Sequence, residues 1–224
     1  MTALVATTTP TARYFTDYDN DNRPEDDSGL AAAFAEVGRR AVVGRVFPRH
    51  DLPPVIALSG PAGSGKSTVS AYLATRHGYA LTKFAGPLKN MCRAIGLDDR
   101  HIEGDLKEEP LEELAGHTPR HAMQTLGEAW GRKCIGEDFW VDLWRQSAMK
   151  LDLVVVDDCR YPNEAAAVRR MGGRILRLAG RGGISGKHAS EAQDFIADHI
   201  ISNSDSIKDL HERVDRTLEE WSSR

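Results

Sequence analysis

Residues 60–67 read Gly-Pro-Ala-Gly-Ser-Gly-Lys-Ser. They follow the apolar run 55–58 and precede a helical pattern over 68–74, so the sequence predicts a strand, a glycine-rich loop and a helix in that order. This spacing is that of a phosphate-binding P-loop, in which consecutive backbone N–H groups turn toward an anion. A glycine-rich turn with an unrelated lysine is the alternative, and the strand and helix around the loop argue against it. We therefore expect a nucleoside triphosphate site here.

Each residue type in the loop has a chemical reason. Glycine permits the backbone angles that turn N–H groups inward, and the following helix adds the positive end of its dipole. The ammonium of Lys66 can reach the β- and γ-phosphates, and the hydroxyl of Ser67 suits Mg²⁺. The expected cofactors are thus ATP and Mg²⁺, with nucleotide contacts from Gly60, Ala62, Gly63, Ser64, Gly65, Lys66, Ser67 and Thr68.

Composition indicates one globular domain with an appendage, because the chain has 224 residues and a net charge of -4. A mildly acidic chain favours neither nucleic acid nor a membrane as a partner. Three scattered cysteines without a CxxC pair are typical of reduced thiols. The start lacks the apolar core of a signal peptide, and charges interrupt the apolar stretch 30–47. We expect a cytoplasmic protein.

The chain before the P-loop has a different character from the rest. Residues 1–29 are rich in aspartate and turn formers, which predicts a disordered acidic tail, because a calcium loop would need a glycine and a closing glutamate that are missing. Residues 30–51 combine helical spacing with a proline-rich linker, and the main domain is expected over 52–224.

Strands and helices alternate beyond the loop. Apolar runs at 79–84, 151–156, 174–178 and 199–201 predict strands, and the segments between them have helical spacing or are polar loops. Among these segments we expect a helix over 119–134 and a second helix that the side chain of Asp138 caps. This order predicts an α/β fold with a parallel sheet, helices on both faces, and ligands at the carboxyl ends of the strands. Residues 180–190 are glycine-rich and basic, which favours a lid that closes over phosphates, with a solvated hairpin as the alternative.

Two acidic residues and an arginine follow the strand 151–156, which in this fold class runs beside the P-loop strand. Asp157 or Asp158 can hold Mg²⁺ or its water, and Arg160 can bind an acceptor phosphate through two parallel hydrogen bonds. Which aspartate serves the metal stays open at this point. Among the aromatic residues, Phe139, Trp140 and Trp144 favour a core stripe. Trp130 is the candidate for stacking on a base, although a core position is the more frequent role for such a residue.

These residues together resemble the phage deoxynucleoside monophosphate kinases. Residues 158–164, Asp-Cys-Arg-Tyr-Pro-Asn-Glu, look like the Asp-x-Arg…Asn-Glu segment of that family. Further segments that resemble it, in the same order, lie at 84–89, 120–127, 138–141, 165–173, 188–191 and 201–210. Two departures stand out: the extension before Leu52, and Glu128-Ala129-Trp130 in place of the more usual Gly-Thr-Asp/Glu, which leaves the base specificity open.

The resemblance implies transfer of the ATP γ-phosphate to a deoxynucleoside 5′-monophosphate, in the cytoplasm of a host if the gene is a phage gene. It also implies a three-layer nucleoside monophosphate kinase fold with five parallel strands, a monophosphate-binding helical region at about 86–150 and the lid at 180–190. It implies that Lys66 and Ser67 serve ATP and Mg²⁺, that Arg120, Gln124, Asp158 and Arg160 face the acceptor nucleotide together with Lys89, and that Glu191 and His188 close the rim. With the reasoning from the residues added, the candidate catalytic residues are Lys66, Asp158, Arg160 and Arg181, and the candidate metal ligands are Ser67 and Asp158. Trp130 is a further candidate substrate contact.

Three other functions are compatible with parts of the sequence. One is a kinase of the same fold that acts on a modified base within DNA, although no basic stripe is visible. Another is a kinase for a different small phosphorylated metabolite, and a third is a P-loop switch or ATPase without an acceptor. We expect small-molecule nucleotides as partners, no membrane and no direct nucleic acid, and a homodimer is left open.

Overall fold

The structure is a computed structural model that describes residues 51–182 and 194–223. The chain separates into two units, 1–44 and 45–224, and the described residues belong to the second. The predicted tail over 1–29, the helix and linker over 30–50, and most of the predicted lid, with His188 and Glu191, lie outside the described residues. Those predictions stay untested.

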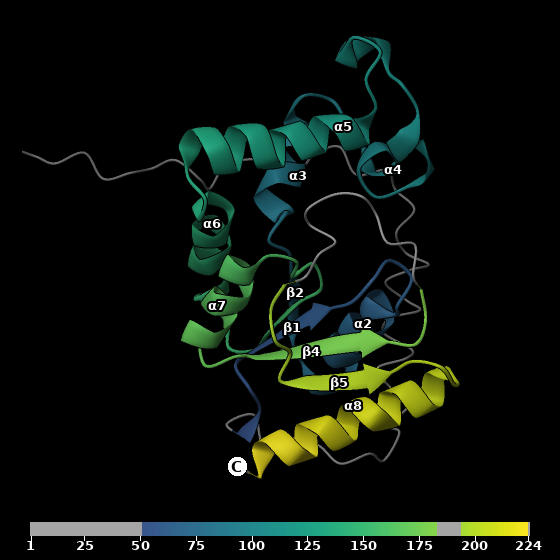
Figure 1. The fold of residues 1–224 in the computed structure, drawn as a ribbon, viewed down its shortest axis with the longest axis vertical. Helices are drawn as coiled ribbons and strands as arrows, with labels where there is room; N and C mark the ends of the chain where they lie inside the picture. Colours follow the sequence, from purple (N-terminus) through teal and green to yellow (C-terminus); the bar gives the residue numbers. More distant parts are fainter. Residues whose placement is uncertain (1–50, 183–193, 224) are drawn as a thin grey trace, which may run out of the picture. The chain divides into compact units, whose positions relative to one another are not determined.

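A five-stranded parallel sheet forms the centre of the described part (Figure 1). Its strands are β1 (Val55–Ser59), β2 (Ala80–Thr82), β3 (Val154–Val156), β4 (Arg174–Ala179) and β5 (His199–Ser202). They lie in the order β2-β3-β1-β4-β5, and every pair is parallel. The predicted fold class is thus confirmed, as is the place of the strand bearing Asp157 and Asp158 beside the P-loop strand, with Val55 opposite Val154.

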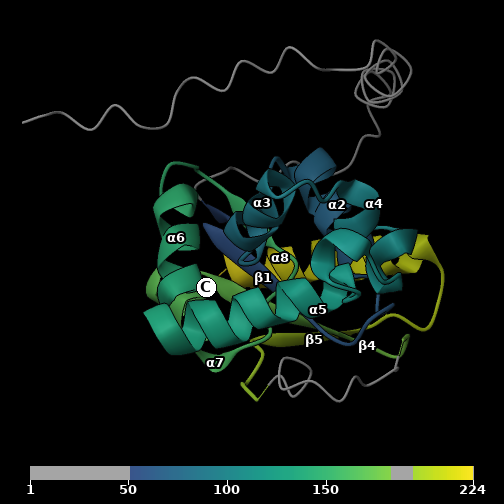
Figure 2. The same cartoon turned by 90° about the horizontal axis from the view of Figure 1, so that it is seen from above.

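Both faces of the sheet are covered because the strands are apolar on both sides. All five residues of β1 are buried, and alternate residues point to opposite faces. Ile56 and Leu58 pack against α2 (Lys66–His77) and α8 (Ile207–Ser222). Val55 and Ala57 belong to the other core, with side chains of α6 (Phe139–Ala148) and α7 (Pro162–Arg170). These are the outer layers seen in Figures 1 and 2.

The region between β2 and β3 forms a separate helical layer with its own core. It contains α3 (Gly86–Ala94), α4 (Asp99–Ile102), the 3₁₀ turns η2 (Asp105–Glu108) and η3 (Glu112–Leu114), and α5 (Pro119–Gln124). Its buried side chains are Leu88, Cys92, Leu97, Ile102, Met123 and Trp140. Figure 1 shows α4 and α5 in this layer, away from β5 and α8. Among the described residues, no helix is long and apolar enough to cross a bilayer.

The helix predicted over 119–134 exists but changes type. α5 continues directly into a π-helical segment, η4 (Thr125–Ile135), which the sequence pattern did not indicate. The indole of Trp140 lies against this segment, where Nε1 donates to the carbonyl of Gly127 at 2.9 Å. A Cβ on Gly131 would lie 2.3 Å from the same Nε1, so only glycine allows this contact.

Asp138 occupies the predicted cap position of α6 without the predicted side-chain cap. Its Oδ1 instead accepts a hydrogen bond from Asn163 Nδ2 at 2.8 Å, at the start of α7. The prediction of a side-chain cap is therefore wrong, because a tertiary partner takes the carboxylate. The contact joins α6 to the segment 158–164, which carries the strongest family resemblance.

Candidate active site

The P-loop has the geometry that its sequence predicts. Gly60, Gly63 and Gly65 adopt positive φ angles of 133°, 75° and 99°, and α2 begins at Lys66. Neighbouring segments hold the loop closely: a Cβ on Gly60 would lie 2.5 Å from the carbonyl oxygen of Leu178. Asn203 Nδ2 donates to the carbonyl of Ser64 at 2.9 Å. The loop is thus pre-formed between β1 and α2.

Lys66 lies back across the loop. Its Nζ donates to the carbonyl oxygens of Gly60 and Pro61, both at 2.8 Å. The buried Ser64 Oγ has no hydrogen-bond partner among the described residues. A glycine-rich loop that leads into a helix N-terminus, with a cation beside it and an unsatisfied buried hydroxyl, fits the terminal phosphates of a nucleotide.

The two acids at the end of β3 have different surroundings. Asp157 Oδ2 accepts a hydrogen bond from Ser70 Oγ at 3.4 Å, and Ser70 Oγ also contacts the carbonyl of Ser67 at 3.1 Å. Asp157 Oδ1 is buried without a hydrogen bond in the described part of the chain, and Lys83 Nζ lies 3.8 Å away. Asp157 is thus the acid beside the P-loop helix, with an oxygen available for a hydrated cation.

Asp158 points into a different environment. Its Oδ1 accepts from the backbone N–H of Phe84 at 2.9 Å, and its Oδ2 accepts from that of Ala85 at 3.0 Å. Burial raises the pKa of this carboxyl, and the two backbone N–H groups lower it. Because both oxygens have protein donors, the expectation that Asp158 holds the metal does not fit this geometry. Asp157 is the better candidate.

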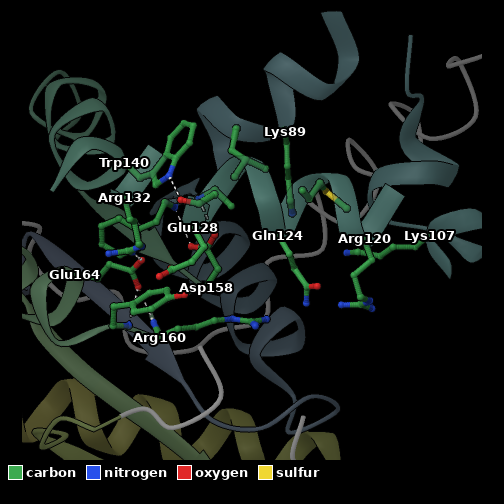
Figure 3. Close-up of a pocket in the computed structure, with 16 residues that line it drawn as sticks. Lys89, Lys107, Arg120, Gln124, Glu128, Arg132, Trp140, Asp158, Arg160 and Glu164 are labelled. Atoms are coloured by element: carbon green, nitrogen blue, oxygen red, sulfur yellow. Dashed lines mark hydrogen bonds and ion pairs between the residues drawn. The ribbon is translucent and has the colours of Figure 1, made fainter. Parts of the chain in front are cut away.

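Most of the predicted substrate residues line one pocket (Figure 3). The pocket lies between α3, α5 with η4, and the turn after β3. Of the predicted contacts, Lys89, Arg120, Gln124, Asp158 and Arg160 line it. Lys89 pairs with Glu103, and Arg120 pairs with Glu108. The structure therefore brings together side chains from three separate segments of the sequence.

A fourth cation in the pocket, Lys107, is a residue that sequence reasoning missed. Burial lowers the pKa of Lys107, and the charges of Lys89 and Arg120 lower it further. Cations held this close repel one another, so an anion at their centre would stabilise the arrangement. The cluster fits a phosphate group.

Arg132 and Glu164 form a buried ion pair that the sequence analysis also missed. Glu164 Oε1 accepts from Arg132 Nη2 at 2.9 Å, and Glu164 Oε2 accepts from the backbone N–H groups of Arg160 and Tyr161 at 2.7 and 3.0 Å. Arg132 also stacks on the ring of Tyr161, 3.7 Å from its centroid. Burial and the charge of Asp158 raise the pKa of Glu164 to about 7. This pair fixes the turn that presents Arg160.

Two predicted site residues lie elsewhere. Trp130 is absent from the pocket lining, and its ring packs edge-on against Phe139 with centroids 5.6 Å apart, so the structure places it on aromatic neighbours. Trp140 lines the pocket instead.

Arg181 Nη2 donates to the carbonyl of Asp205 at 3.2 Å, outside this pocket. The next residue, Gly182, packs closely against the P-loop. A Cβ added to Gly182 would lie 2.1 Å from the carbonyl oxygen of Ala62.

Comparisons with known proteins agree with the resemblance drawn from the sequence. No family model matches the chain. A protein of Acanthamoeba polyphaga mimivirus named "Putative deoxynucleotide monophosphate kinase" is 29% identical over 181 residues, which cover 71% of this chain and 93% of that protein. The resemblance to deoxynucleotide monophosphate kinases is confirmed.

A second curated protein matches a smaller part of the chain. A bifunctional pantoate ligase/cytidylate kinase of Prochlorococcus marinus is 43% identical over 54 residues, or 24% of this chain and 10% of that protein. Among solved structures, TT1252 from Thermus thermophilus has 20% identity and a TM-score of 0.45, covering 75% of this chain and 98% of its own.

Proposed function

We propose that this protein transfers the γ-phosphoryl group of ATP to the 5′-phosphate of a deoxynucleoside monophosphate. One observation carries the proposal: adjacent residues at the end of β3 face two sites. Asp157 contacts the P-loop helix, and Asp158 lines a pocket that contains Lys89, Lys107, Arg120 and Arg160. A phosphate donor in the loop and a phosphate acceptor in the pocket would therefore meet at this strand end. The mimivirus relative supports the choice of acceptor.

The residues divide the work of phosphoryl transfer between them. Lys66 and the loop N–H groups would hold the donor phosphates, and Ser67 and Asp157 would hold Mg²⁺ or its waters. Bound there, Mg²⁺ supplies positive charge to the β- and γ-oxygens. Arg160, fixed through Glu164, would orient the acceptor phosphate and neutralise charge that develops on the transferred group. No side chain has to act as a nucleophile, so the buried thiol of Cys159 needs no catalytic role.

The function is tested by measuring ADP formation with ATP and Mg²⁺, alone and with each deoxynucleoside monophosphate. We expect slow ADP formation without an acceptor and a large increase with at least one monophosphate. The increase should disappear in Lys66→Ala. Equal ADP formation with and without every acceptor would contradict the proposal and favour a P-loop switch or ATPase.

A further inference from the structure

Charge is unevenly distributed within the acceptor pocket. In Figure 3 the charged groups of Lys89, Lys107, Arg120 and Arg160 gather on one side. The carboxylates of Glu128, Asp158 and Glu164 lie toward the other, where Arg132 is the one cation among the described residues that line the pocket and is paired with Glu164. A nucleoside monophosphate has the matching polarity, with a dianionic phosphate at one end and a base at the other. If the pocket holds such a molecule, its phosphate lies among the cations and its base lies near the carboxylates.

Protein donors already satisfy two of the three carboxylates. Asp158 accepts from the backbone of Phe84 and Ala85. Glu164 accepts from Arg132 and from two further backbone N–H groups. Every oxygen of these two carboxylates already holds at least one protein donor, which fixes both side chains in place. These two carboxylates therefore shape the pocket and do not read the base.

Glu128 differs from the other two. Its one ion pair within the described residues is with Lys133, whose Nζ lies 3.8 Å from Oε1, beyond hydrogen-bonding distance. The side chain of Lys133 is 70% exposed, whereas that of Glu128 is 33% exposed and lines the pocket. Glu128 is thus the pocket carboxylate whose oxygens can accept hydrogen bonds from a ligand.

The surroundings of Glu128 suit a flat ring. Phe84, Leu88, Met123 and Trp140 contribute apolar surface to the same pocket. The indole N–H of Trp140 is already bonded to Gly127, so Trp140 offers the ligand its apolar ring. Gln124 lies four positions before Glu128 on the same helical wall and lines the pocket. Its amide could donate to a carbonyl oxygen of the base.

We propose that Glu128 makes the pocket selective for guanine, an inference that rests on the proposed function. A carboxylate has acceptors only, and its two oxygens match two adjacent donors. Among the four bases, guanine alone presents two, N1–H and the 2-amino group. Adenine and cytosine each present one amino group beside a ring nitrogen acceptor. Thymine presents one N–H between two carbonyls, which would face the carboxylate with like partial charge. The preferred acceptor is therefore dGMP.

The test compares the wild type with Glu128→Gln, which keeps the size of the side chain and replaces one acceptor by a donor. The first readout is kcat/KM for dGMP, dAMP, dCMP and dTMP. The second is the Kd of each monophosphate without ATP, which does not depend on turnover. Glu212→Gln is the matched control, because it removes an equal charge from a residue paired with Lys208 on α8. Thermal melting checks that all variants fold.

We expect the wild type to bind dGMP at least tenfold more tightly than dTMP, and Glu128→Gln to lose about 10- to 100-fold in Kd and KM for dGMP, the scale of one bidentate base contact. The other monophosphates should change less, and Glu212→Gln should change nothing. A wild type without guanine preference, or an unchanged ratio of dGMP to dTMP in Glu128→Gln, overturns the inference. Guanine-selective binding that needs Glu128, without turnover of any monophosphate, would support the inference while the proposed function fails.

Discussion

At the scale of single residues, the charge of Lys66 is the simplest test of the P-loop. Lys66→Ala should lower turnover about a thousandfold or more, because cations that clamp the transferred phosphate contribute on that scale. Lys66 itself is only half-buried and its ammonium contacts backbone carbonyls of the loop, not the core, so the fold should persist. Steady-state kinetics and circular dichroism measure both effects. Lys208→Ala, on a lysine of α8 whose side chain is 86% exposed, is the control, and near-normal turnover in a folded Lys66→Ala would refute the donor site.

Arg160 belongs to the acceptor side. Arg160→Ala should raise the KM for the monophosphate by the equivalent of about 1.5–3 kcal/mol, the contribution of a charge-assisted hydrogen bond, with a smaller change in the KM for ATP. The control is Arg145→Ala, because Arg145 lies on α6 with its side chain 51% exposed and pairs with Asp142. An unchanged acceptor KM in Arg160→Ala would show that the arginine has another role.

The raised pKa of Glu164 makes stability depend on pH. This pKa is about 7 in the folded protein, against an ordinary 4.5, chiefly because the carboxyl is buried. The folded state keeps the proton over that interval while the unfolded chain releases it. This contribution to stability is complete below pH 4.5 and is lost as the pH rises through 7.

Glu164→Gln does not titrate, so it isolates this contribution. Relative to the variant, the wild type should lose on the order of 3 kcal/mol of unfolding free energy between about pH 4.5 and pH 8. Urea unfolding of both proteins at several pH values measures the difference. A difference independent of pH would mean that Glu164 stays ionised in the folded protein.

Residues differ in how far the sequence could reveal them. Lys66 and Arg160 belong to contiguous motifs whose chemistry is local. The Arg132–Glu164 pair joins η4 to α7, and such a contact follows only from packing. One signal was nonetheless present: Glu164 lies three residues after Tyr161 and before an apolar run, which is capping-box spacing.

At the scale of elements, the transition from α5 to the π-helical segment positions the pocket wall. Gly131→Ala would put a methyl group against the Trp140 indole and should destabilise the protein by about 1–3 kcal/mol, the usual cost of overpacking. It should also weaken acceptor binding, because Trp140 lines the pocket. Gly136→Ala is the control, since a Cβ there meets nothing within 4 Å. Denaturant unfolding and acceptor KM are the measurements, and equal stability of the two variants would contradict this role.

The change of helix type also separates the positions of Trp130 and Trp140. Periodicity places Trp130 on the helix that carries Gln124. It does not indicate which aromatic ring faces the pocket and which faces away from it. In the structure, Trp140 from α6 packs under Gly131 and reaches the pocket, and Trp130 lies over Phe139 and Trp140. A local change of helical pitch at glycine is hard to predict from apolar spacing. The lid over 180–190 stays a prediction, of which the structure describes only the first residues, with Gly182 on the P-loop.

At the scale of the whole described domain, the sheet could be predicted because its signals are strong and local. Buried parallel strands appear as continuous apolar runs, and the P-loop fixes which strand is central. The pairing of β1 with β3 could therefore be predicted. Because these strands are parallel neighbours, the donor loop lies beside Asp157 and Asp158 at one end of the sheet. The helical layer between β2 and β3 was predicted only as a region, because its polar turns carry weak periodicity.

The most direct test of the central claim follows the terminal phosphate of ATP. The protein is incubated with γ-³²P-labelled ATP, Mg²⁺, the four deoxynucleoside monophosphates and duplex DNA that contains hydroxymethylated pyrimidine. The products are then separated. We predict that the label appears in a deoxynucleoside diphosphate, and that Lys66→Ala prevents this. Label found only in inorganic phosphate, or only in the DNA, would contradict the account.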